Sequence, residues 1–215
     1  MSDAIDYSTE LTEASWSRMV TKVGDLDVLC ASGAQCSVTA SQFSYFRLLN
    51  FAQRRYDDII VDLPGAIEDA AEPLVTHSRG VYLICTPELT SLALARRRFR
   101  QLEMRGVHES ALAVILNRYD QAEFSKERIA ELIGHPIAAQ LPNDYQSIKL
   151  SIESGGFVDP DTELGKAYLR LAARLAGLDP DRLPGMSRLK ALLRKLAPRH
   201  EAADYVGPLE HVVKR

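Results

Sequence analysis

Short apolar runs alternate with longer amphipathic stretches along most of the chain. Each apolar run is hydrophobic at both odd and even positions and ends at proline, glycine, asparagine or serine, as expected for a parallel strand that is covered on both faces. The pattern predicts five strands: LDVLCAS (26–32), DIIVDL (58–63), GVYLICT (80–86), ALAVILNR (111–118) and PIAAQLP (136–142).

Amphipathic stretches between these runs predict helices at roughly 39–54, 66–78, 89–105, 125–133 and 162–176. Strands that are separated by helices indicate an α/β protein with a doubly wound, mostly parallel sheet and flanking helices. We therefore expect one globular domain over residues 1–178 and a tail over 179–215, because the composition changes near Gly177.

The tail contains a candidate basic amphipathic helix after the linker LDPDRLPG (178–185). Its apolar positions fall on one helical face, and basic residues surround them: Met186, Leu189, Leu192, Leu193 and Leu196, with Arg188, Lys190, Arg194, Lys195 and Arg199. Such a helix over 186–199 suits an anionic membrane surface. The alternative is a helix that docks on its own domain or on a protein partner.

Composition narrows the class of protein further. The chain has 215 residues, 46% hydrophobic and 26% charged, with a net charge of −3, so no overall basic excess favours nucleic acid. Its cysteines, Cys30, Cys36 and Cys85, form no Cys-x-x-Cys pair, which is typical of reduced thiols in a cytoplasmic protein without structural zinc. No apolar stretch has membrane-spanning length, and the N-terminus does not resemble a secretory signal.

Polar residues follow four of the predicted strands, where ligands bind in open α/β sheets. They are Asp62, followed by Leu63-Pro64-Gly65; Glu88, in Thr86-Pro87-Glu88; Asn117 with Arg118; and Pro142-Asn143-Asp144. An acid there can hold a magnesium-bound water, and an asparagine amide can pair with the edge of an adenine. Each of these residues could equally be a turn or capping residue.

Four segments, in this order, resemble the MinD/ParA family of deviant P-loop ATPases, and most closely its branch with the pilus-assembly protein CpaE. They are YDDIIVDLPG (56–65), VYLICTPELTSLALARR (81–97), LAVILNRYD (112–120) and PIAAQLPNDYQSIKLSIESGGFV (136–158). The resemblance implies a P-loop NTPase-like fold, with ATP and Mg²⁺ as cofactors.

The resemblance also implies roles for the strand-end residues. Asp62 would be the catalytic, switch-II-type aspartate that holds Mg²⁺ through water, and Leu63, Pro64 and Gly65 would form the switch. Asn117 and Arg118 would contact the adenine, while Pro142, Asn143 and Asp144 would line the base. Glu88 would lie near the nucleotide or the dimer face.

The phosphate-binding loop of that family, Gly-x4-Gly-Lys-Ser/Thr, does not occur in the sequence. Its one Gly-Lys pair, Gly165-Lys166, is followed by Ala167 and has Pro160 where the first glycine should stand. Phosphoryl transfer depends on positioning and charge neutralisation, so we expect no useful ATP hydrolysis by this chain, which could bind no nucleotide at all. The P-loop strand would also be missing from the sheet, leaving its two neighbours with unpaired backbone groups.

Two explanations stay open at this point: a truncated ATPase or misassigned start, and a non-catalytic paralogue that serves as a scaffold for protein partners or membrane. Family function would be ATP-dependent homodimerisation that positions a pilus or secretion machine, in the cytoplasm or peripherally at the inner face of the membrane. ARRRFRQLEMR (95–105) carries five arginines. We expect a solvated helix face with Leu94, Phe99 and Leu102 turned inward; DNA contact, as in the ParA branch, fits poorly with the acidic net charge.

Overall fold

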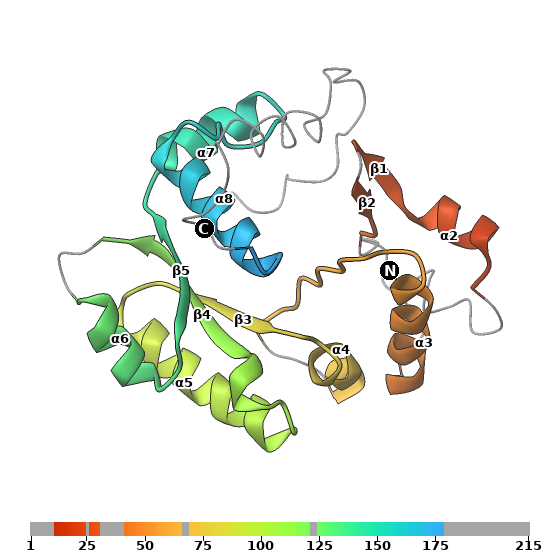
Figure 1. Ribbon diagram of the computed structural model, residues 1–215, viewed down its shortest axis with the longest axis horizontal. Helices are drawn as coiled ribbons and strands as arrows, with labels where there is room; N and C mark the ends of the chain where they lie inside the picture. Colours follow the sequence, from red (N-terminus) through yellow and green to blue (C-terminus); the bar gives the residue numbers. More distant parts are fainter. Residues whose placement is uncertain (1–10, 25, 31–40, 66–68, 121–123, 179–215) are drawn as a thin grey trace, which may run out of the picture.

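The computed structural model describes residues 11–24, 26–30, 41–65, 69–120 and 124–178 (Figure 1). The elements of these ranges are, in chain order, α2 (Glu13–Met19), β1 (Thr21–Val23), β2 (Leu26–Val28), α3 (Gln42–Gln53), η1 (Asp69–Ala71), α4 (Glu72–Thr76), β3 (Val81–Cys85), α5 (Leu89–Met104), η2 (Glu109–Ala111), β4 (Leu112–Tyr119), α6 (Lys126–Ile133), β5 (Ile137–Pro142), α7 (Tyr145–Glu153) and α8 (Glu163–Leu175). The predicted tail at 179–215, with its candidate helix at 186–199, lies outside the described residues.

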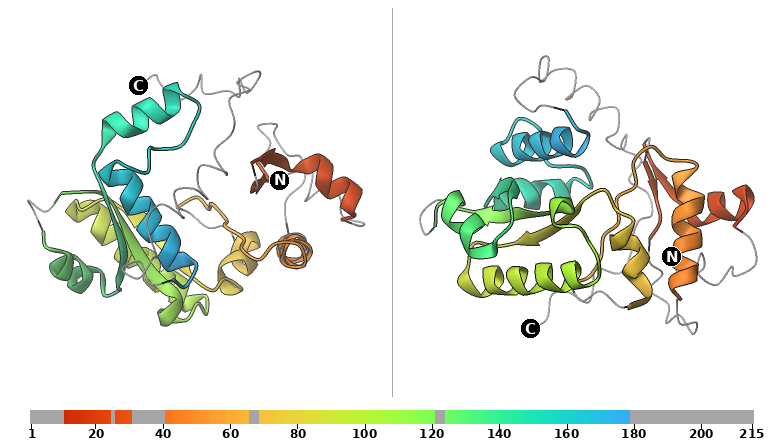
Figure 2. Two further views of the ribbon diagram at one scale, coloured as in Figure 1. Left: turned by 45° about the horizontal axis from the view of Figure 1, so that its top comes forward. Right: turned by 60° about the horizontal axis from the view of Figure 1, so that its bottom comes forward.

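A parallel sheet with strand order β3-β4-β5 forms the centre of the protein. Helices α5 and α6 cover one face, and α8 lies across the other (Figure 2). The prediction of an α/β protein with a parallel sheet and flanking helices is therefore confirmed, as are the strands predicted at 80–86, 111–118 and 136–142.

The central strand β4 shows why its sequence is apolar at both odd and even positions. Leu112, Val114 and Leu116 lie in the core cluster under α5 and α6, whereas Ile115 packs with Leu164 of α8 on the opposite face. Successive side chains of a strand point to opposite faces, so a strand between two helical layers buries both sets.

Local sequence signals set the helix ends. Ser125 and Thr162 accept backbone hydrogen bonds as N-caps of α6 and α8, and Gly134 ends α6 at φ 85°. Side-chain oxygens at the N-cap satisfy free N–H groups, and glycine adopts the left-handed conformation without steric cost. The helix predicted at 66–78 is instead the short η1 and α4, where Pro73 lies in the first turn of α4.

The prediction that 26–32 belongs to the parallel sheet was wrong. Among the described residues 26–30, Leu26–Val28 form a strand. It pairs antiparallel with β1, with Thr21 opposite Val28, and Gly24 in the intervening turn has φ 61°. A separate small core lies between α2 and α3 and includes Trp16 and Leu48; Val20 and Leu29, which flank the hairpin, pack against it. The sequence pattern did not predict α2, β1 or α7.

The prediction of a strand at 58–63 was also wrong. These residues lie between α3 and η1 without forming a strand, and Ile59, Ile60 and Val61 are 38%, 87% and 37% exposed. Strands are held by hydrogen bonds to neighbouring strands, and none of the described strands pairs with this segment. The strand propensity of these residues is therefore not enough by itself to give the segment regular structure.

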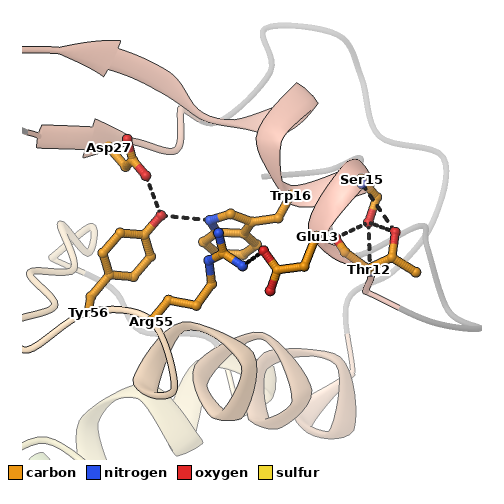
Figure 3. Close-up of polar contacts among 7 residues, drawn as sticks. All are labelled: Thr12, Glu13, Ser15, Trp16, Asp27, Arg55 and Tyr56. Carbon is orange, nitrogen blue, oxygen red and sulfur yellow. Dashed lines mark hydrogen bonds and ion pairs between the residues drawn. The ribbon is translucent and has the colours of Figure 1, made fainter.

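A chain of hydrogen bonds ties the start of this segment to the N-terminal elements (Figure 3). Trp16 Nε1 donates to Tyr56 Oη at 2.7 Å, and Tyr56 Oη donates to Asp27 Oδ2 at 2.6 Å. Arg55 also pairs with Glu13 of α2. One tyrosine hydroxyl thus joins α2, β2 and the residues that follow α3.

Substitution Tyr56→Phe should lower the free energy of unfolding by about 2 kcal/mol, because it removes a hydrogen bond from the indole and another to a carboxylate. Chemical denaturation followed by tryptophan fluorescence would measure the change. Tyr145→Phe is the control, because Tyr145 is 71% exposed on α7. Equal stability of Tyr56→Phe and wild type would show that the chain of hydrogen bonds contributes nothing.

Helix α5 carries the arginine cluster. Arg96, Arg97 and Arg100 are exposed, and Phe99 and Leu102 are buried, as predicted. Leu94 is 53% exposed, so the expectation that it turns inward was wrong: the buried stripe of α5 runs through Leu92 and Ala95 instead. No helix in the described part of the chain is long and apolar enough to cross a membrane.

Candidate functional site

The carboxyl ends of β3, β4 and β5 lie at one edge of the sheet, because the three strands are parallel and adjacent. The structure thereby brings together three of the four predicted strand ends: the loop with Glu88, the end of β4 with Asn117 and Arg118, and the turn with Asn143 (Figure 1). We call this edge, at residues 86–90, 117–119 and 142–144, the carboxyl edge.

The end of β4 is irregular where Asn117 and Arg118 stand. Leu116 pairs with Gln140 and Tyr119 with Pro142, so β4 has an extra residue there relative to β5. Arg118 has φ 52°, and the described residues include no other non-glycine residue with positive φ. Such bulges and left-handed residues re-aim side chains and are frequent at functional sites.

Only the oxygen of the Asn117 side-chain amide is hydrogen-bonded within the described part of the chain. Its Oδ1 accepts a hydrogen bond from the backbone N–H of Arg118 at 3.0 Å, and its NH₂ group has no hydrogen-bond partner among the described residues. An amide can donate two hydrogen bonds and accept two, so Asn117 still has the donor and acceptor that an adenine edge requires. The sequence indicated the residue but not the bulge that presents it.

The loop after β3 is held by its own polar groups. Thr86 N–H donates to Ser91 Oγ at 3.1 Å, and Thr86 Oγ1 donates to the exposed carboxylate of Glu88, which directly precedes α5. Glu88, Leu89, Thr90 and Phe124 line a shallow depression beside this loop. Leu89 and Phe124 were not expected at the site, because their apolar side chains carry no chemical signal.

Asp144 has a structural role in the turn after β5. Its carboxylate accepts hydrogen bonds from Ser147 N at 3.0 Å and Ser147 Oγ at 2.5 Å, and it caps the N-terminus of α7. The hydrogen bond from the Ser147 side chain, and then that from its backbone, lower the pKa of Asp144 below the usual value. Of the three residues predicted to line a base, Asn143 is exposed, and its side chain has no hydrogen-bond partner within the described part of the chain; Pro142 is part of β5.

Unlike the residues of the carboxyl edge, Asp62 does not follow a strand. It is exposed and lies in the segment without regular structure, while Leu63 packs against the main core and Pro64 and Gly65 are exposed. Mg²⁺ prefers six oxygen ligands, and the described residues contain no group of three His, Cys, Asp or Glu residues that could hold a metal. In nucleotide sites Mg²⁺ is held by one or two carboxylates together with waters and phosphate oxygens, so the role of Asp62 near Mg²⁺ stays a prediction.

Cys85, the last residue of β3, is buried beneath the carboxyl edge. Burial, and secondarily the negative charge of Glu88, raise the pKa of its thiol from 9.0 to about 11. Both effects disfavour the thiolate, so this cysteine is not an activated nucleophile.

The raised pKa of Cys85 predicts a loss of stability in alkali. A folded-state pKa above the unfolded one gives stability that is complete below pH 9.0 and is lost as the pH rises to about 11. Denaturation of wild type and Cys85→Ala across this window is the measurement. As the pH rises, the free energy of unfolding of wild type should fall relative to that of Cys85→Ala. A difference that stays constant over this range would contradict the prediction.

Sequence comparison finds relatives among septum site-determining proteins; no family model matches the chain. A putative MinD of Emiliania huxleyi is 24% identical over 167 residues, which are 72% of this chain and 61% of the relative. MinD of Helicobacter pylori is 24% identical over 192 residues, 81% of this chain and 69% of the relative. The chain thus spans less than two thirds of the first of these proteins.

Solved structures of ParA and MinD proteins are also similar to this chain. A ParA family ATPase from Chlorobium tepidum superposes with a TM-score of 0.71 at 25% identity, over 78% of this chain and 72% of that one. MinD from Pyrococcus horikoshii, complexed with Mg-ADP, has a TM-score of 0.61 at 17% identity, over 80% of this chain and 76% of that one, which shows the fold alone. Together, the parallel sheet and these similarities show that the chain is a homologue of the MinD/ParA family of ATPases.

Proposed function

We propose that this chain belongs to an ATP-dependent positioning system of the MinD/ParA kind, in which a homodimer places a pilus or secretion machine, as in the CpaE-like branch. Its carboxyl edge is the face that takes the adenine of ATP. The observation that carries the proposal is the irregular end of β4, where Asn117 keeps a free amide donor beside Arg118 at φ 52°.

The chemistry of the edge suits a base better than a phosphate. Asn117 and Asn143 offer amide groups, and Leu89 and Phe124 give the neighbouring depression an apolar part. The Glu88 carboxylate would repel phosphate oxygens at close range. A neutral, planar ring with donors and acceptors on its edge is the ligand that these groups complement.

The phosphate side of a nucleotide site has no counterpart in this sequence. Gly-x4-Gly-Lys-Ser/Thr is absent from the 215 residues, and the Asp62 carboxylate lies in a segment without regular structure. Backbone N–H groups and the lysine of that loop supply most of the favourable contacts to a triphosphate. We therefore propose that this chain alone binds the base weakly, with a dissociation constant of about 1 mM, and does not hydrolyse ATP.

Amide chemical shifts during titration with adenosine, and separately with Mg-ATP, test the proposal. Adenosine should shift the resonances of Asn117, Asn143 and the loop at Glu88. Asn117→Ala should abolish these shifts, whereas Asn50→Ala should not, because the Asn50 side chain bonds to Phe46 O within α3.

Two results would oppose the proposal. Shifts that survive in Asn117→Ala would place the base elsewhere. Measurable ATP hydrolysis by the purified chain, lost in Asp62→Asn, would show a working phosphate site despite the absent motif.

A non-catalytic scaffold is the second candidate, favoured by helix α7. Its Ile148 packs toward α8, while Tyr145, Leu150 and Ile152 are 71%, 63% and 67% exposed. Apolar side chains gathered on one helix are typical of a surface that binds a protein partner. Binding that is independent of nucleotide and is lost in Leu150→Asp would favour the scaffold.

Peripheral membrane association through 186–199 forms part of the same proposal. Co-sedimentation with vesicles of anionic lipid should fall when residues 186–199 are deleted. The basic residues there would be attracted to the anionic headgroups, and the apolar residues would bury their side chains in the membrane interface. Undiminished co-sedimentation of the deletion variant would rule this helix out as the anchor.

A further inference from the structure

The outer surface of α5 carries a cluster of arginines that pair with no residue in the described part of the chain. The cluster consists of the exposed Arg96, Arg97 and Arg100. The two neighbouring arginines are engaged, because Arg98 donates to Gln101 Oε1 at 2.8 Å and Arg105 lies 2.7 Å from Asp69 Oδ1. The charge of the cluster is therefore available to a ligand.

This cluster destabilises α5 unless an anion balances it. Arg100 is four residues after Arg96 and three after Arg97, and like charges at these spacings face one another on a helix. The acid of α5, Glu103, has its carboxylate 3.2 Å from Nε2 of the buried His135 and not beside an arginine. The described residues thus supply no counter-charge, and the surface suits a negatively charged ligand.

Apolar side chains stand at both ends of the same surface. Leu94 is 53% exposed and Met104 is 80% exposed, and both share a helical face with Arg97. A shallow depression of about 310 Å³ lies among the side chains of Ala93, Arg96, Arg97, Arg100, Gln101 and Met104. We call these residues and Leu94 the arginine face, which extends about 15 Å along α5.

The order of charged and apolar groups selects the kind of ligand. A nucleic acid would use the arginines but not Leu94 or Met104, because its outer surface is phosphate. A helix that binds a membrane needs a broad apolar face, and the apolar stripe of α5 is already buried in the core through residues such as Phe99. A protein helix can carry acids at its centre and apolar residues at both ends, which matches the whole face.

We propose that the arginine face binds an acidic amphipathic helix of a protein partner. This helix lies along α5, with acids facing the three arginines and apolar residues against Leu94 and Met104. Carboxylates form the two-point hydrogen bonds that guanidinium groups prefer, and about three turns of helix span the face. The proposal requires no nucleotide and does not rest on the proposed function.

A synthetic helical peptide is the probe, with leucine at positions i and i+10, glutamate at i+3 and i+7, and alanine or glutamine elsewhere. Fluorescence anisotropy of the labelled peptide should show saturable binding to the full chain. The double variant Arg97→Glu with Arg100→Glu should bind at least about tenfold more weakly, because two attractive ion pairs become repulsive.

The matched control is the double variant Arg54→Glu with Arg170→Glu. Both arginines are exposed, Arg54 at the end of α3 and Arg170 in α8, and the change in net charge is the same. Because charges away from the face are screened by salt, the affinity should change by no more than about twofold.

Two further measurements separate charge from apolar contact. Met104→Ser should weaken binding about threefold through lost apolar area, and the core is untouched because Met104 is 80% exposed. A peptide with glutamine in place of both glutamates should bind at least about tenfold more weakly to the wild-type chain, a test that requires no protein variant.

Any of three results would overturn the proposal. Equal affinity of the glutamate and glutamine peptides, or no binding of either at about 1 mM, would show that the face does not recognise an acidic helix. An equal loss in both double variants would show a response to net charge alone. Tighter binding of duplex DNA or of anionic vesicles than of the peptide at the same salt, abolished by Arg97→Glu with Arg100→Glu, would assign the face to nucleic acid or to membrane instead.

Discussion

Replacing Phe99 by alanine should lower the free energy of unfolding by about 3–5 kcal/mol, which is among the largest effects expected for one side chain of this protein. Phe99 is 1% exposed and lies in the main core, between α5 and the sheet. Its ring also stacks on His135, with ring centroids 4.0 Å apart. The substitution removes buried apolar area and leaves a cavity that the rigid strands cannot close.

Denaturant-induced unfolding, monitored by circular dichroism, measures the loss. Arg97→Ala is the matched control on the same helix, because Arg97 is exposed and such surface substitutions change stability by no more than about 0.5 kcal/mol. Should Phe99→Ala and Arg97→Ala prove equally stable, the core described around α5 would be incorrect.

Replacing Gly165 by alanine should lower the free energy of unfolding by about 3 kcal/mol, because there is no room for the added methyl group. A Cβ at this position would lie 2.0 Å from the carbonyl oxygen of Asp159 and 2.7 Å from Pro160 Cα. Both are backbone atoms, so the loop before α8 would have to move. This movement would also strain the hydrogen bond by which Gly165 N–H donates to the N-cap Thr162 Oγ1 at 3.0 Å.

Gly65→Ala is the control for this prediction, because nothing lies within 4 Å of a Cβ at Gly65 and its φ is not positive. Thermal unfolding should show a clear fall in Tm for Gly165→Ala and almost none for Gly65→Ala. If Gly165→Ala keeps its Tm, the loop is mobile enough to accommodate the methyl group, and the close contact with Asp159 is not a constraint.

Gly165 illustrates how little a short motif says without its surroundings. In the sequence, Gly165-Lys166 is notable only as a Gly-Lys pair that fails to match a phosphate-binding loop. In the structure, the glycine is needed because α8 begins in contact with the loop that precedes it. Asp144 is similar: its carboxylate caps α7, a role that the sequence did not indicate, and the nucleotide contact that the resemblance implies stays a prediction.

The sequence by itself determined the parallel strands β3, β4 and β5, the helices between them and the edge at which polar residues gather. Those features follow from side-chain periodicity and from caps such as Ser125 and Thr162, which act over a few residues. Only the tertiary structure decided the rest. DIIVDL has the composition of a strand but pairs with none of the strands that the structure describes, and the bulge at Asn117 depends on its register with β5. Pairing and register are set by distant parts of the chain, which no local pattern contains.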